Sequence, residues 1–556
     1  MTLVKRLLVM VALSVSSMQL LAQLFHNPIL AGFYPDPSIC RAGDDYYIVN
    51  SSFAYYPGLP IFHSKDLLNW QQIGSALNRP EQLNLDGAGV SRGLFAPSIS
   101  YHNGLFYIVC TLIDKGGNFV VTATDPKGSW SNPVWLPQVN GIDPSLFFDD
   151  NGRSYIVYNS IPPNNKSMHD GHRTIRINQF YPETMKVDTG NRIIVNGGTD
   201  MAKKPVWIEA PHIFKKDGWY YLICAEGGTG YNHSEVVFRT RDIDSAFISY
   251  DKNPILTQRQ LDPNRKYPIT TAGHAQMVQA RDGHWWAVFL ACRPYEGDYY
   301  NTGRETFMAP VGWKDGWPII NPQYAAIQYR YPIAAASNAL REKFNGNFLF
   351  KDGFEKGALN NRYVFLRTLR EDWYSIQKGM LEIRPRLETC SGKGNPSFIG
   401  FRQSHIKGHV ATSLQFSPKD STEKAGLVIF QNEQHYYFIC KSIKEGKPVV
   451  KLFQSGSSIG SEETEICSKP LPLTGSEELR LKIEARGSSY AFYYAAGSHQ
   501  WQLLKADMDA RFLSTKIAGG FVGSIYGMYA TSNNGSTATK AYYDWFESKN
   551  DDEMYK

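Results

Sequence analysis

The stretch DPSICRAGDDYYIV at residues 36–49 contains a short apolar segment, a polar turn and an aromatic-rich segment. The same motif recurs as APSISYHNGLFYIV at 96–109, DPSLFFDDNGRSYIV at 143–157 and APHIFKKDGWYYLI at 210–223. A degenerate fifth copy, GHAQMVQARDGHWWAV, occupies residues 273–288. The copies begin roughly 50–70 residues apart, which is enough for four short strands each, so the repeat predicts a five-bladed β-propeller.

The register of the repeat places acidic residues at matching positions. Asp36 and Asp143 each open a copy, and Glu209 precedes the fourth copy by one residue. Matching positions on the innermost strands of a propeller face one another around the central axis. We therefore expect these three carboxyl groups, from distant parts of the chain, to share one pocket. Taken alone, an Asp-Pro-Ser step is more often a turn or the start of a strand.

Composition limits the classes of partner. The chain has 556 residues, of which 42% are hydrophobic, so two or more domains with real cores are expected. The net charge of +6 is spread without a basic stripe, which argues against a nucleic-acid partner. Aromatic residues make up 13% of the chain, and their flat rings suit both sugar stacking and β-rich cores.

The N-terminus resembles an export signal. Lys5-Arg6 precedes an apolar run over residues 7–21, and Ala22 offers a cleavage site. We therefore expect a signal peptide at residues 1–22 and a periplasmic or secreted protein. A membrane anchor is the alternative, but the run is short for a span. The seven cysteines are an odd number with no C-x-x-C pair, so no disulfide framework is expected.

The repeats end near Pro332, and the weakly patterned segment 333–339 follows. Beyond it the motif stops, but apolar and polar residues continue to alternate, as in LRLKIEA at 479–485. Helical periodicity is scarce. The pattern predicts an all-β chain, with a propeller over residues 24–335 and a β-sandwich over residues 344–550.

Three carboxyl groups in one pocket are typical of glycoside hydrolysis, which needs two of them on either side of the scissile bond. A third group often shifts the pKa of one of the two.

In the fifth copy, His274 stands where the other copies carry Pro. A lone His on a strand is usually a core residue, and a metal ligand is the alternative.

Several segments resemble glycoside hydrolase family 43, in particular its two-domain branch of β-xylosidases and α-L-arabinofuranosidases. The resemblance rests on NPILAGFYPDPSICRAGDDYYIVNSS, GIDPSLFFDDNGRSYIVYN, WIEAPHIFKKDGWYYLICAEGGTGYNH and TTAGHAQMV. The C-terminal segments PSFIGFRQ, AGLVIFQNEQHYY and FVGSIYGMYATS resemble that branch's concanavalin-like, jelly-roll sandwich. The resemblance covers almost the whole mature chain.

The resemblance implies roles for the three acids. Asp36 would be the general base that activates water, and Glu209 the general acid that protonates the leaving oxygen. Asp143 would raise the pKa of Glu209 and orient it. The family inverts the anomeric centre, which implies room for a water molecule between the base and the acid.

The resemblance also implies residues around the acids. His274 would be the main protein ligand of one calcium ion, and no organic cofactor is expected. Arg293 would contact substrate hydroxyls, with a structural ion pair as the alternative, whereas Arg304 would order the pocket wall. The aromatic residues expected at the pocket are Phe53, Phe95 and Phe521, the last with a core position as an equal alternative.

The expected activity is removal of one terminal α-L-arabinofuranose from plant cell-wall hemicellulose or its oligosaccharides. β-D-Xylosidase activity, alone or in addition, is the alternative. Phe95 and Ser98 depart from the β-xylosidase pattern, which has Trp and His there. A sandwich against the propeller would block one end of an open cleft, which disfavours endo-cleavage. A non-catalytic glycan-binding protein is a further alternative, disfavoured because all three acids are present.

Overall fold

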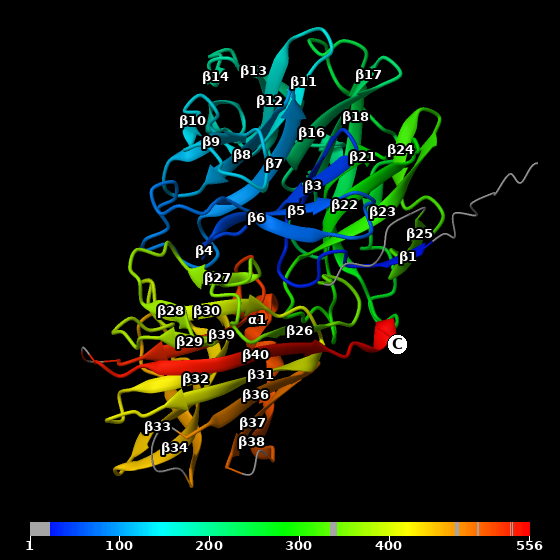
Figure 1. The fold of residues 1–556 in the computed structure, drawn as a ribbon. Helices are drawn as coiled ribbons and strands as arrows, with labels where there is room; N and C mark the ends of the chain where they lie inside the picture. The colour runs from blue at the N-terminus through cyan, green and yellow to red at the C-terminus, as the bar shows by residue number, and fades with distance from the viewer. Residues whose placement is uncertain (1–22, 334–341, 473–476, 498–499, 534, 536) are drawn as a thin grey trace, which may run out of the picture.

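The computed structural model describes residues 23–333, 342–472, 477–497, 500–533, 535 and 537–556. Its propeller and sandwich lie one above the other in Figure 1. The expected signal peptide lies outside the described residues, as does most of the expected connector. The predicted all-β class is confirmed, since the described residues contain only one α-helix, α1 (Thr515–Ala518). The other helical turns are η1 (Pro163–Asn165), η2 (Met201–Lys203), η3 (Ala510–Leu513) and η4 (Glu553–Tyr555).

Within the described residues, five sheets form the predicted propeller (Figure 1). The first blade comprises β2 (Ser38–Ala42), β3 (Asp45–Val49), β5 (Gly58–Ser64) and β6 (Gln71–Leu77). The second comprises β7 (Leu94–His102), β8 (Leu105–Leu112), β9 (Gly117–Ala123) and β10 (Val134–Trp135). The third comprises β11 (Ile142–Phe148), β12 (Ser154–Ser160), β13 (Thr174–Tyr181), β14 (Lys186–Val187) and β15 (Arg192–Asn196). The fourth comprises β16 (Glu209–Lys216), β17 (Trp219–Glu226), β18 (Ser234–Thr240), β19 (Ile248–Ser249) and β20 (Leu256–Thr257). The fifth comprises β21 (Thr270–Gln279), β22 (Trp285–Cys292), β23 (Glu305–Lys314) and β24 (Trp317–Ile320).

Each blade begins with a left-handed residue that carries a side chain. The positive φ angles are 49° at Asp36, 35° at Ala96, 54° at Asp143, 50° at Ala210 and 56° at His274. The inner strands of the second to fifth blades shift register at this point. A left-handed residue other than glycine is strained by about 1–3 kcal/mol, so the fold holds these five positions against their local preference.

This geometry corrects the register of the fifth copy. Gln276 pairs with Val288 as Ser38 pairs with Val49. Counting back two residues from Gln276 and from Ser38 aligns His274 with Asp36. The alignment of the sequence repeats had instead placed His274 opposite the proline that follows the aspartate, Pro37. Ala275 therefore replaces the proline.

The two ends of the propeller domain are clasped together. Strand β1 (Gln23–His26) pairs antiparallel with β25 (Arg330–Ile333). Phe25 on this pair packs against Trp286 of the fifth blade and Tyr331, with ring centroids 5.8 and 5.6 Å apart. The clasp thus fixes residues 23–26 beside the fifth blade.

The C-terminal domain is the expected concanavalin-like sandwich of two large sheets. One sheet contains β28 (Tyr374–Gln377), β29 (Met380–Ile383), β40 (Ala541–Asn550), β31 (Lys407–Phe416), β36 (Leu479–Arg486), β37 (Ser489–Ala496), β38 (Gln502–Asp509) and β26 (Leu349–Asp352). The other contains β35 (Thr464–Pro470), β34 (Lys447–Gln454), β33 (His435–Lys444), β32 (Lys424–Asn432), β39 (Ile525–Thr531), β30 (Ser397–Arg402), β27 (Tyr363–Leu366) and β4 (Tyr55–Tyr56).

Strand β4 belongs to the propeller segment of the chain but completes the sandwich sheet. Tyr56 pairs with Phe365 and Tyr55 with Leu366, and Figure 1 shows β4 beside β27 where the two domains meet. The domains therefore share a sheet and a continuous buried core. Within the described residues, no helix combines the length and apolar content that a membrane crossing requires.

Candidate active site

The three acids line one cavity of about 540 Å³, whose walls are propeller residues together with Phe521 of the sandwich. Asp36, Asp143 and Glu209 are all buried. The first two occupy left-handed blade-opening positions, and Glu209 is the residue before the fourth such position, Ala210. The remaining lining residues are Phe53, Arg92, Phe95, Ala96, Ile113, Ile142, Arg173, Trp207, Gly228, Thr229, His274, Arg304 and Phe521.

Asp36 is surrounded by groups that favour its ionised form. Arg304 donates from Nη1 to Oδ1 of Asp36 at 3.2 Å, and Ser51 donates from its hydroxyl to Oδ2 at 2.6 Å. Ser51 Oγ in turn accepts the backbone N–H of Ala96 at 2.7 Å. Burial alone would raise the pKa of Asp36, but Arg304, His274 and Ser51 together hold it below its ordinary value. The side chain is an ionised carboxylate, as a general base must be.

Glu209 has the opposite environment. Burial raises its pKa well above the ordinary value, and the neighbouring carboxylates Asp143 and Asp36 raise it further, against the opposing charges of Arg304 and Arg173. It therefore keeps its proton at a pH where Asp36 has lost its own. Two carboxyl groups with pKa values pushed apart in one pocket are the arrangement of an acid and base pair.

Asp143 fixes the backbone beside Glu209. Its Oδ2 accepts the backbone N–H of Ala210 at 3.1 Å. Burial raises the pKa of Asp143, while His274 and this hydrogen bond act in the opposite direction. Asp143 thus both positions Glu209 and raises its pKa.

An aromatic wall closes one side of the cavity. The ring centroid of Phe53 lies 5.0 Å from that of Phe95 and 6.0 Å from that of Phe521. The guanidinium of Arg304 lies 5.5 Å from the Phe521 ring centroid. Phe521 comes from the sandwich and is tied to the propeller, since its backbone N–H donates to Ser91 Oγ at 3.0 Å. The wall therefore needs both domains.

Both domains match known families. The description "Glycosyl hydrolases family 43" matches residues 25–318, and "Beta xylosidase C-terminal Concanavalin A-like domain" matches residues 351–549. The chain belongs to glycosyl hydrolase family 43. It is a glycoside hydrolase of the kind that acts on hemicellulose.

Relatives of this family 43 enzyme extend over both domains. It is 38% identical to a "Xylosidase/arabinosidase" of Butyrivibrio fibrisolvens, over 94% of this chain and 98% of the relative. It is 34% identical to the "Non-reducing end alpha-L-arabinofuranosidase BoGH43B" of Bacteroides ovatus, over 97% of this chain and 98% of the relative. A crystal structure of a GH43_12 protein from a capybara gut metagenome is 39% identical, with a TM-score of 0.85 and coverage of 93% and 96%.

His274 lies in the pocket beside the base, with its Nδ1 3.8 Å from Oδ1 of Asp36. Among the described residues, no group of three His, Cys, Asp or Glu side chains is arranged to hold a metal ion. Calcium takes six to eight oxygen ligands, and one imidazole nitrogen does not provide them. The described side chains therefore do not form a calcium cage, and an ion at His274 would depend on water for its other ligands.

The structure places Arg293 away from the pocket, in contrast to the expected substrate contact. It is 1% exposed and binds Glu305 through Nε and Nη2 at 2.6 and 2.9 Å. Its Nη1 donates to Asp552 of the sandwich at 2.9 Å. Arg293 is thus the centre of an ion cluster between the domains, and Arg304 is the arginine that reaches Asp36.

Sequence reasoning missed four polar or aromatic residues of the pocket: Arg92, Arg173, Trp207 and Thr229. They lie on loops that follow or precede the repeat strands. Of the four, Trp207 could have been suspected from the sequence, because it stands only two residues before Glu209.

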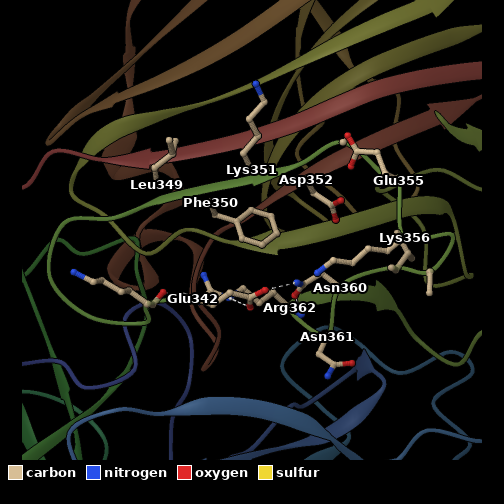
Figure 2. Close-up of a pocket in the computed structure, with 14 residues that line it drawn as sticks. Glu342, Leu349, Phe350, Lys351, Asp352, Glu355, Lys356, Asn360, Asn361 and Arg362 are labelled. Atoms are coloured by element: carbon tan, nitrogen blue, oxygen red, sulfur yellow. Dashed lines mark hydrogen bonds and ion pairs between the residues drawn. The ribbon is translucent and has the colours of Figure 1, made fainter. Parts of the chain in front are cut away.

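A second concavity of about 390 Å³ lies in the sandwich domain of the hydrolase, beside β26 (Figure 2). Two of its polar side chains contact the Glu342 carboxylate: Asn360 donates to it at 3.2 Å, and Arg362 Nε lies 3.9 Å from it. Asp36, Asp143 and Glu209 do not line it. The three carboxyl groups expected to be catalytic therefore lie in the propeller cavity and not in this one.

Proposed function

We propose that this family 43 hydrolase is an inverting exo-α-L-arabinofuranosidase that acts on hemicellulose side chains or oligosaccharides. The observation that carries the proposal is the opposite direction of the two pKa shifts in one cavity. Asp36 is held ionised by Arg304 and Ser51, while burial and the charge of Asp143 keep Glu209 protonated. One carboxylate can therefore accept a proton while the other donates one.

The proposed reaction is a single displacement. A water molecule beside Asp36 attacks the anomeric carbon and gives one proton to the carboxylate. Glu209 donates its proton to the glycosidic oxygen, so the carbon–oxygen bond breaks and the leaving sugar departs as an alcohol. Proton exchange with solvent then restores the ionised base and the protonated acid.

Exo-action is supported by the way the cavity ends. Phe521 of the sandwich lines the cavity together with Phe53 and Phe95. Strand β4 and the Arg293 cluster hold the sandwich against the propeller. A polysaccharide chain that had to pass through the site would meet this wall, so a terminal sugar is the better occupant.

The choice of arabinose rests on the pocket residues and on one relative. Phe95 lines the cavity where the β-xylosidase pattern has Trp. Ser98, the second departure from that pattern, does not line the cavity; it is buried, with its hydroxyl 3.5 Å from that of Ser38. The Bacteroides ovatus relative carries the name of an α-L-arabinofuranosidase. β-D-Xylosidase is the second candidate, because a relative from Bacillus subtilis, 30% identical, is named "Beta-xylosidase".

Two measurements test the proposal. Hydrolysis of nitrophenyl α-L-arabinofuranoside should exceed that of nitrophenyl β-D-xyloside in kcat/KM, and the reverse order would make the enzyme a β-xylosidase. Proton NMR of the first product should show the inverted anomer before mutarotation. Direct appearance of the retained anomer would overturn the single displacement.

A further inference from the structure

Trp207 is the exposed aromatic residue at the edge of the cavity. Its side chain lines the cavity, and the residue is 38% exposed, whereas Phe53 in the same cavity is 2% exposed. It stands two residues before Glu209, on the segment that leads into β16. The indole therefore lies on the side of the cavity that belongs to the acid.

The backbone of Trp207 is held in place by the neighbouring loop. Its φ is +54°, and its N–H donates to the carbonyl of Gly171 at 2.8 Å. Gly171 itself has a φ of +75°, and a Cβ there would lie 2.8 Å from Val206 Cγ1 and 3.4 Å from Trp207 Cδ1. The close approach of the two loops thus requires glycine, and it fixes a backbone that tryptophan would not adopt alone.

Arg173 supports the indole. Its guanidinium carbon lies 4.8 Å from the ring centroid of Trp207, in a cation–π contact. Two guanidinium nitrogens donate to Oδ1 of Asn159 at 3.0 and 2.6 Å, and the amide nitrogen of Asn159 donates to the carbonyl of Ile208 at 2.5 Å. Asn159 therefore links the supporting arginine to the residue between Trp207 and Glu209.

A ring that is fixed by its backbone and by a cation, and is still exposed beside the acid, is suited to binding a ligand. In the proposed reaction Glu209 protonates the leaving oxygen, so the leaving group lies on its side of the cavity. Sugar rings present C–H faces that pack on flat aromatic rings with a polar edge. We infer that Trp207, supported by Arg173, is the stacking platform for the sugar unit that leaves, a pyranose of an oligosaccharide or polysaccharide. This inference rests on the proposed function.

The test compares two substrates with the same terminal sugar. One is its methyl glycoside, whose leaving group is too small to cover an indole, and the other is a xylo-oligosaccharide that carries the sugar as its non-reducing end. Trp207→Leu removes the aromatic face and Trp207→Tyr retains one. Trp135→Leu is the matched control, because Trp135 is 43% exposed on the outer strand β10 and does not line the cavity.

Trp207→Leu should lower kcat/KM on the oligosaccharide by about 2–12-fold more than on the methyl glycoside, the range for one aromatic stacking contact. Trp207→Tyr should recover most of that loss, and Trp135→Leu should change neither value. Equal losses on both substrates, or no rescue by tyrosine, would overturn the inference while leaving the proposed function intact. Failure of the wild type to cleave either substrate would instead overturn the proposed function, and the inference with it.

Discussion

Arg304 donates a hydrogen bond from Nη1 to Oδ1 of Asp36 across 3.2 Å, and so joins the residue before β23 of the fifth blade to the opening residue of the first. The contact keeps the base ionised in a buried site. Because Glu209 in the same cavity remains protonated, the proposed base and the proposed acid are in the charge states that their roles require at one pH. Both carboxyl groups are buried, so their neighbours decide the difference in charge: Arg304 lowers the pKa of Asp36, and Asp143 raises the pKa of Glu209.

The roles of the two carboxyl groups should separate on substrates with different leaving groups. Asp36→Ala and Glu209→Gln should each lower kcat on natural glycosides, by about 10²–10⁴-fold for loss of a positioned acid or base. On an activated aryl glycoside, whose leaving group needs little protonation, the kcat of Glu209→Gln should return towards that of the wild type, whereas the kcat of Asp36→Ala should stay low. Melting curves of both variants check that the fold is kept. Identical behaviour of the two variants on the aryl substrate would refute the assignment of roles.

The raised pKa of Glu209 should also appear in the stability of the protein. The folded state binds a proton that the unfolded chain releases at the ordinary glutamate pKa, near 4.5. Stability from this group is complete below that pH and is lost as the pH rises through the folded pKa, by about 1.4 kcal/mol for each pH unit. Glu209→Gln cannot ionise, so the variant should melt above the wild type by a margin that grows as the pH rises from the ordinary glutamate pKa towards the raised folded pKa. A constant margin would contradict the raised pKa.

The repeat predicted the blade count and the shared pocket because each blade supplies its own apolar inner strand and aromatic second strand. It misaligned His274 by one residue, since Ala275 replaces the proline used as the reference. The partners of the inner strand were the better reference: Gln276 lies opposite Val288 as Ser38 lies opposite Val49. The pairing register of the strands therefore aligns the fifth repeat correctly, whereas a single recurring residue type, the proline, does not.

The neighbours of the acids could not be predicted from local pattern. Arg293 and Arg304 stand at the two ends of the β22–β23 connection, and the sequence does not say which one faces the axis. The partner that captures Arg293 is Asp552, 259 residues away in the other domain. Trp207 and its supporting arginine lie on loops outside the repeat, whose approach depends on a left-handed glycine. Contacts of this kind arise only when the chain is folded.

Arg293 should be a stability residue and not a substrate contact. Its removal leaves the carboxylates of Glu305 and Asp552 buried without a cation, which typically costs about 3–5 kcal/mol. Arg293→Met should therefore lower the melting temperature strongly. Arg153→Met is the matched control: its ion pair with Asp244 is exposed, and such pairs contribute about 0–1 kcal/mol. If Arg293→Met melts at the wild-type temperature but has a raised KM, Arg293 contacts the substrate, as the sequence had led us to expect.

A calcium ion beside His274 would act on the charge of Asp36. His274 occupies the blade-opening position next to Asp36, so a cation there, with water as its other ligands, would favour the ionised form of Asp36. We propose such an ion, bound weakly because one protein ligand contributes little. Chelator treatment should lower activity and melting temperature modestly, and added calcium should restore both. His274→Ala should show the same losses without rescue. The measurement is a calcium titration of chelator-treated wild type and His274→Ala, read by activity, by melting temperature and by elemental analysis. If the wild type ignores the chelator and carries no metal, His274 serves as a wall residue that lowers the pKa of Asp36 through its proximity.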